Sequence, residues 1–160
     1  LLRALEERFF REQRERLERL TKPDAWGDAS LAAIVRGCAA ELVAVFRQRR
    51  TLIRAFAARA VHDVEFRGEA QRFQREVAER VSSLLLSRPG AIGHPRPALA
   101  VPIAVTMVFS AMIAGAAFGD PRHPIASLSD EDAAEELARN FLGYLQVQAP
   151  PASRSTQEIL

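Results

Sequence analysis

The sequence contains few of the residues that build most catalytic and metal centres. In 160 residues it has one cysteine, Cys38, and three histidines, His62, His94 and His123. A single cysteine excludes an intrachain disulfide and a zinc site made of several thiolates. The histidines do not occur in an H-E-x-x-H motif or in paired Glu-x-x-His motifs, which a di-iron site in a helical bundle requires. We therefore expect no cofactor and no metal ion.

The sequence also has almost no excess of charge. Its 22 basic and 20 acidic residues leave a net charge of +2, which is too small to drive nucleic-acid binding. We find no G-x-S-x-G motif, no glycine-rich phosphate loop and no regular alternation of aromatic and basic residues. These absences favour a binding or assembly module over an enzyme, and we expect no catalytic residues.

What the sequence does have is helical periodicity. Apolar residues recur at helical spacing in four segments, which are residues 1–20, 31–46, 52–61 and about 68–87. Ser30 or Asp28 is a plausible N-cap for the second helix, and Pro89 ends the fourth. Ser129, followed by three acidic residues, predicts a final helix that runs to Gln146. No strand pattern is found, so the sequence predicts an all-α fold with about six helices.

One segment, residues 98–119, contains no charged residue. As a helix it would be about 33 Å long, enough to cross a bilayer core of roughly 30 Å. Its many small residues, Pro102 and the lack of an aromatic belt at either end favour instead a buried helix at the centre of a bundle. A membrane-tethered helical protein anchored by residues 98–119 remains the alternative.

Aromatic and sulfur side chains from several segments suggest a small-molecule cavity. They include Phe10, Phe66, Phe73, Met107 and Phe109, and the hydroxyls of Thr106 and Ser110 lie one turn apart on the uncharged helix. A cavity lined in this way is mainly apolar, with a few fixed polar groups. The alternative is an ordinary core in which each hydroxyl bonds to a backbone carbonyl one turn earlier.

The order of four segments is typical of one known family. They are residues 1–9, residues 54–86 with Asp63-Val64-Glu65-Phe66-Arg67 inside them, residues 119–121, and residues 129–138. Together they resemble the C-terminal half of TetR-family transcriptional regulators over about residues 1–145. This resemblance implies an effector-binding and dimerisation domain over residues 1–147. The composition of residues 148–160, which include two adjacent prolines, predicts a flexible tail.

The resemblance also implies a function and partners. The domain is expected to be the non-enzymatic ligand-sensing part of a bacterial transcriptional repressor, to be cytoplasmic, and to form a homodimer through residues 98–119 and 129–146. Its partner would be an apolar or aromatic small-molecule effector. The helix-turn-helix of the family is not found in these residues, so we expect DNA binding only through an N-terminal domain that is missing from this chain, and no contact with membranes.

Two sets of site residues follow from the resemblance and the apolar pattern. The expected effector-binding residues are Phe10, Cys38, Phe56, Phe66, Phe73, Val77, Thr106, Met107, Phe109 and Ser110. The expected dimer-interface residues are Ala104, Val108, Ala111, Gly115, Leu137, Phe141, Tyr144 and Leu145.

Overall fold

The computed structural model describes residues 2–88, 91–118 and 124–147. In chain order its elements are α1 (Leu2–Thr21), the 3₁₀ helix η1 (Pro23–Ala25), α2 (Leu31–Gln48), α3 (Arg50–His62), α4 (Val64–Leu86), α5 (Pro97–Phe118), α6 (Pro124–Ser127) and α7 (Asp130–Tyr144). No strand occurs within these ranges, which confirms the all-α prediction. The short helices η1 and α6 lie in segments for which the sequence predicted no helix.

Two helices begin at the capping residues that the sequence predicted. The hydroxyl of Ser30 accepts a hydrogen bond from the N–H of Ala33 at 3.2 Å, and that of Ser129 accepts one from Asp132 at 3.0 Å. Each cap satisfies a backbone donor that the first helical turn leaves without a partner. These local bonds explain why α2 and α7 begin where they do.

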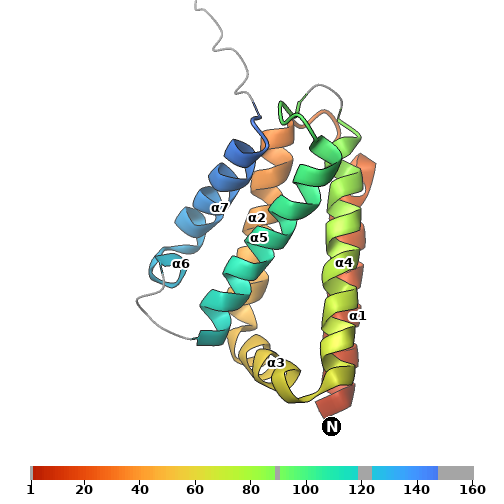
Figure 1. Cartoon of the computed structure of the whole chain (residues 1–160), viewed down its shortest axis with the longest axis vertical. Helices are drawn as coiled ribbons and strands as arrows, with labels where there is room; N and C mark the ends of the chain where they lie inside the picture. The colour runs from red at the N-terminus through yellow and green to blue at the C-terminus, as the bar shows by residue number, and fades with distance from the viewer. Residues whose placement is uncertain (1, 89–90, 119–123, 148–160) are drawn as a thin grey trace, which may run out of the picture.

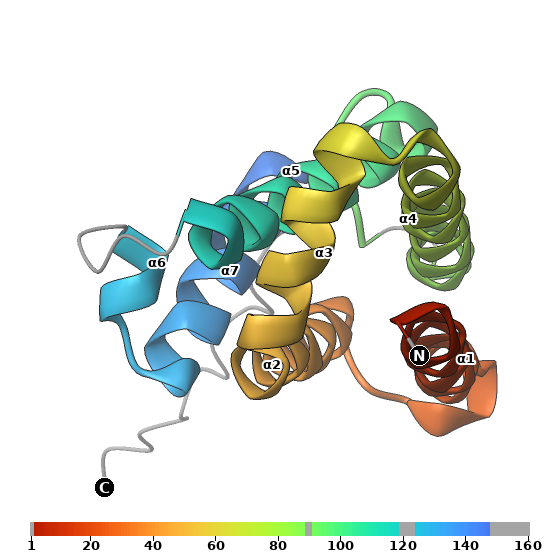
Figure 2. The ribbon, with the colours of Figure 1, turned by 90° about the horizontal axis from the view of Figure 1, so that it is seen from below.

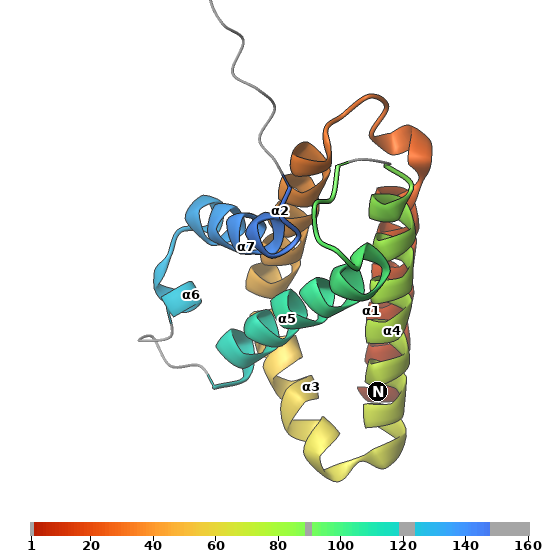
Figure 3. The same ribbon diagram turned by 45° about the horizontal axis from the view of Figure 1, so that its top comes forward.

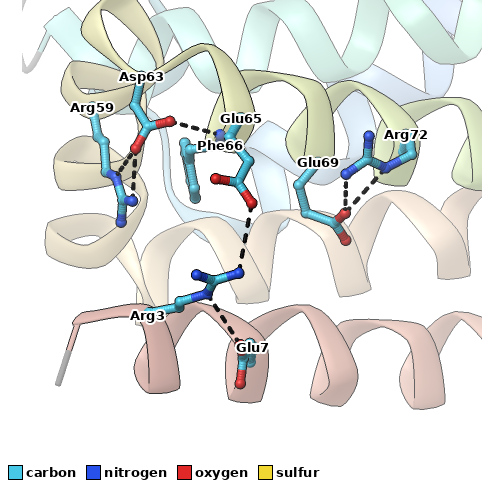
Figure 4. Close-up of polar contacts among 8 residues, drawn as sticks. All are labelled: Arg3, Glu7, Arg59, Asp63, Glu65, Phe66, Glu69 and Arg72. Carbon is cyan, nitrogen blue, oxygen red and sulfur yellow. Dashed lines mark hydrogen bonds and ion pairs between the residues drawn. The ribbon is translucent and has the colours of Figure 1, made fainter.

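Helix α4 begins earlier than predicted, at Val64 rather than near Gly68. Its N-cap is Asp63, whose carboxylate accepts a hydrogen bond from the N–H of Phe66 at 2.9 Å (Figure 4). The same carboxylate accepts two bonds from Arg59, at 2.7 and 2.9 Å. The Phe66 amide and then the Arg59 guanidinium hold the pKa of Asp63 below its usual value. The cap therefore joins α3 to α4 across a single residue instead of a loop.

The helices form two groups joined by α3 and α5. Helix α1 lies along α4, and α2 packs along α7 (Figures 1 and 3). Helix α5 crosses between the groups and contacts α2, α3, α4 and α7. Seen from below, α1 and α4 stand together at one side, and α3 leads from α2 towards α4 (Figure 2). This arrangement leaves α1 attached mainly to α4.

Ion pairs fix α1 on its neighbours from the outside. Arg14 contacts Glu69 at 2.7 Å and Glu76 at 3.0 Å, so one guanidinium joins α1 to two turns of α4. Arg3 reaches Glu65 near the start of α4 at 3.5 Å (Figure 4). Such exposed or half-buried pairs each contribute little energy, but they set the register of one helix on another.

Helix α5 is buried on one side and exposed on the other. Ala100, Val101 and Ala104 are almost completely buried in the core. The opposite side exposes large apolar residues, which are Leu99, Ile103, Met107 and Ile113. By length and composition Pro97–Ala116 is long and apolar enough to cross a membrane, and 33% of it is buried in the structure. Its contacts with α2, α3, α4, α6 and α7 make it part of the bundle.

The connection between α1 and α2 is held by the single tryptophan. The indole N–H of Trp26 donates to the carbonyl of Leu20 at 2.6 Å, and the ring covers Gly37 of α2. A Cβ atom at position 37 would lie 2.4 Å from a ring carbon of Trp26. Glycine is therefore required here by close approach and not by backbone conformation.

Replacing this glycine tests the contact. We expect Gly37→Ala to destabilise the protein by about 1–3 kcal/mol, because the added methyl displaces the Trp26 ring. Urea unfolding followed by circular dichroism measures the change. The matched control is Gly143→Ala in α7, where nothing lies within 4 Å of the added Cβ. That variant should gain about 0.5–1 kcal/mol from reduced backbone entropy. Equal stabilities of Gly37→Ala and the wild type would contradict the packing described.

Candidate functional site

A cavity of about 360 Å³, partly open to solvent, lies between the helices and is lined by residues of α1, α2, α3, α4, α5 and α7. Eight of the nine phenylalanines in the sequence line it. They are Phe9, Phe10, Phe46, Phe56, Phe66, Phe73, Phe109 and Phe141. Aliphatic residues such as Val35, Leu42 and Val77 complete the wall. The interior is therefore suited to an apolar or aromatic molecule.

The phenylalanine rings form a connected cluster on one side of the cavity. Phe10 is its centre, with ring centroids 5.5 Å from Phe73 and 6.1 Å from Phe66. Phe56 of α3 lies 5.3 Å from Phe9 and 5.1 Å from Phe66. Such edge-to-face and tilted pairs stabilise the folded chain beyond the burial of their area. The wall of the cavity is consequently a structured part of the core.

Polar side chains line the cavity at a few places. Arg16 of α1 and Glu41 of α2 form an ion pair at 3.3 Å, and both side chains are partly exposed. The hydroxyl of Thr21 donates to the carbonyl of Leu17 at 2.8 Å. The remaining polar lining residues are Gln13 of α1 and Arg67, Gln71 and Gln74 of α4. Within the described ranges no group of three His, Cys, Asp or Glu side chains is placed to hold a metal ion.

Cys38 lines the cavity as an inert thiol. Burial, assisted by the nearby carboxylate of Glu41, raises the pKa of Cys38 from 9.0 to about 11. At neutral pH the side chain is therefore protonated, and a protonated thiol is a poor nucleophile. The structure gives Cys38 the role of a small apolar residue.

Seven of the ten predicted effector residues line the cavity, namely Phe10, Cys38, Phe56, Phe66, Phe73, Val77 and Phe109. Thr106, Met107 and Ser110 do not, because they lie on the exposed side of α5. The hydroxyl of Thr106 donates to the carbonyl of Pro102, one turn earlier, at 2.9 Å. This is the local hydrogen bond expected if Thr106 has no role in a cavity. The cavity therefore does not include these three of the ten predicted positions. Helix α5 is apolar around its whole circumference, so its sequence did not indicate which side faces inward.

The predicted dimer-interface residues fall mostly inside the chain. Ala104, Leu137, Phe141 and Leu145 are buried in the core of the protomer. Val108, Leu137 and Phe141 line the cavity, while Ala111, Gly115 and Tyr144 are partly buried. On α5, the exposed face lies on the other side of the helix from these residues.

Several lining residues were not singled out from the sequence. Phe9 and Phe46 line the cavity together with Ile53, Leu42 and Val45. The signal for them was the unusual share of phenylalanine among the aromatic residues, nine against one tryptophan and one tyrosine. The polar residues Arg67, Gln71 and Gln74 carried no sequence signal, since they resemble the solvated face of any helix.

Comparison with known families identifies the fold. The family described as "Tetracyclin repressor-like, C-terminal domain" matches residues 30–145, which include α2 to α7. The chain belongs to this TetR-like family. No curated protein and no solved structure matches the chain. The TetR-like domain is a regulatory domain of the ligand-binding and dimerisation type. Helix α1 lies outside the matched residues, although its Phe9 and Phe10 line the cavity of this TetR-like domain.

The raised pKa of Cys38 predicts a pH dependence of stability. The thiol of Cys38 keeps its proton to a higher pH in the folded chain than in the unfolded chain. Its contribution to stability is therefore fully present below about pH 9 and is lost as the pH rises towards 11. The wild type should therefore lose up to about 2–3 kcal/mol more than Cys38→Ala across that window. Urea unfolding at a series of pH values measures the difference.

The comparison of slopes separates Cys38 from the other groups that titrate at high pH. Both proteins contain the same Lys22 and Tyr144, so only the difference between the two curves reports the thiol. Parallel curves for wild type and Cys38→Ala would show that the thiol is not desolvated by the cavity wall.

Proposed function

We propose that this TetR-like domain binds a small, mainly apolar effector in the phenylalanine-lined cavity. The domain acts as the non-enzymatic sensor of a cytoplasmic bacterial transcriptional repressor. Effector binding controls DNA binding by a helix-turn-helix domain that lies outside these 160 residues. The observation that carries the proposal is the cavity of about 360 Å³ lined by eight phenylalanines. Membership of the regulatory family supports it.

The physical basis of binding is burial of apolar surface. The cavity volume lies at the lower end of the range of about 300–1,000 Å³ that is usual for ligand sites. A molecule that fills it gains roughly 25 cal/mol for each Å² of apolar surface removed from water. Phenylalanine rings around free volume also lack contact partners on that side, and a bound molecule supplies them.

Filling the cavity with a side chain should prevent binding. Ala57 of α3 lines the cavity, whereas its neighbour Ala58 is exposed and does not. We expect Ala57→Phe to reduce the affinity for the uncharged fluorophore N-phenylnaphthylamine by about tenfold or more, because the new ring occupies the ligand volume. Fluorescence titration measures the affinity.

Ala58→Phe is the matched control, since it adds the same ring to the same helix outside the cavity. Its affinity should equal that of the wild type. A wild-type protein that does not bind the fluorophore, or equal affinities for both variants and the wild type, would refute the cavity as the binding site.

We further propose that the domain forms a homodimer through the exposed face of α5. Ile103 and Met107 are 39% and 48% exposed, which is unusual for two large apolar side chains one turn apart. Membership of a family of dimerisation domains supports a second copy as the partner. Helix α7, which contacts α5, would lie beside this interface.

A charge in the centre of this face should separate the dimer. We expect the wild type to have about twice the mass of the 17.7 kDa chain, and Met107→Arg to have the mass of one chain. Val61→Arg is the control, because Val61 is also an exposed apolar residue but lies at the end of α3. Light scattering after size exclusion in detergent-free buffer measures the masses. A monomeric wild type, or a dimeric Met107→Arg, would overturn this interface, and solubility only in detergent would favour the membrane alternative.

A further inference from the structure

One side of α4 brings an unusual group of polar side chains to the apolar cavity. Arg67, Gln71 and Gln74 are spaced four and three residues apart, so they follow one another along a single side of the helix. All three line the cavity; Arg67 and Gln71 are also exposed to solvent, and Gln74 is half-buried. We call them the α4 polar row.

The α4 polar row has no polar partner inside the part of the chain that the structure describes. Neither the guanidinium of Arg67 nor the amides of Gln71 and Gln74 take part in an ion pair or side-chain hydrogen bond there. The half-buried Glu69 of the same helix differs in this respect, since it is bound by Arg14 and by Arg72, both at 2.7 Å. The donors of the α4 polar row are therefore open to solvent and to a molecule that occupies the cavity.

The charges along the cavity wall do not balance. The charged lining residues are Arg16, Glu41 and Arg67. Arg16 and Glu41 neutralise each other across 3.3 Å. The positive charge of Arg67 is left over, next to two amide groups that can also donate. This combination of donors is complementary to an anion with several acceptor sites.

We propose that the α4 polar row binds the carboxylate of an amphipathic acid whose apolar part occupies the phenylalanine-lined cavity. This inference rests on the proposed function and names the chemical class of its effector. A carboxylate has two acceptor oxygens, and a guanidinium binds them in a planar, charge-assisted arrangement. The adjacent amides supply further donors for the same oxygens.

A cationic amphiphile fits the same wall less well. Its head group would have to separate Glu41 from Arg16 and would face the uncompensated charge of Arg67. An uncharged alcohol can accept a hydrogen bond from the α4 polar row, but it gains nothing from the guanidinium charge. The row therefore discriminates between head groups, while the cavity accepts the apolar chain of all three.

Three molecules with the same chain and different head groups test this inference. They are octanoate, octanol and octylamine, each titrated into the full chain at pH 7.5 by isothermal titration calorimetry. We expect octanoate to bind about tenfold more tightly than octanol, and octylamine to bind most weakly. In Arg67→Gln, octanoate should fall to the affinity of octanol, whose own affinity should not change. Unchanged octanol binding shows that the variant is folded.

The control is Arg75→Gln. Like Arg67, Arg75 is an exposed arginine of α4 that forms no ion pair within the described ranges, but it does not line the cavity. Its removal changes the net charge by the same amount, so octanoate binding should stay at the wild-type level. A loss equal to that of Arg67→Gln would reduce the effect to general electrostatics and overturn the assignment.

The other outcomes separate this inference from the proposed function. Equal binding of octanoate and octanol, unaffected by Arg67→Gln, would overturn the role of the α4 polar row and leave the apolar cavity in place. Tightest binding of octylamine, lost in Glu41→Gln, would replace the acid by a cation. Binding of none of the three molecules, together with no binding of N-phenylnaphthylamine, would overturn the cavity function itself.

Discussion

The packing of Phe10 against the rings of α3 and α4 is the contact on which both the fold and the cavity depend. Its ring centroid lies 6.2 Å from that of Phe56, 6.1 Å from Phe66 and 5.5 Å from Phe73. These contacts attach α1 to the rest of the chain, and the same rings form part of the cavity wall. Each ring is thus packed on one side and faces free volume elsewhere, so a bound molecule would add to the same cluster that stabilises the fold.

Most of the charged side chains near this cluster lie at its outer side, and most of the cavity wall is apolar. Arg14 illustrates the arrangement, because its guanidinium lies over the rings of Phe10 and Phe73 and is bound by carboxylates on the outer side of α4. The hydrogen bond from Arg14 is also the main cause that lowers the pKa of Glu69. Polar contacts at the surface therefore fix much of the register of α1. A buried contact adds to them, because the carboxylate of Glu6 is buried and is bound by Arg59 of α3, which offsets part of its desolvation cost.

The sequence predicted the helices well because their patterns are local. Ser30 and Ser129 are followed by the donors that they cap, and apolar spacing indicated the inner faces of α2 and α4. In α1 it indicated Phe9 and Leu17, but Leu5 is exposed and Glu6 is buried. The start of α4 was missed although the contacts of Asp63 with Phe66 and Arg59 are equally local. The side of α5 was missed because a helix without charge has no amphipathic pattern, and only its neighbours decide which residues are buried. Met107 therefore looked like a cavity residue and is exposed.

The orientation of α5 links the two proposed activities of the domain. Val108 and Phe109 on this helix line the cavity, while Met107, next to them in sequence, belongs to the exposed apolar face. A helix transmits a displacement along its whole length, because its backbone hydrogen bonds resist local bending. A molecule that contacts Phe109 therefore changes the energy of any movement of α5. Each such movement also displaces the exposed apolar face of α5, which contains Met107. Binding free energies at two sites are reciprocally linked. If the effector shifts the equilibrium between two dimer geometries by some factor, the effector affinity must differ between those two geometries by the same factor.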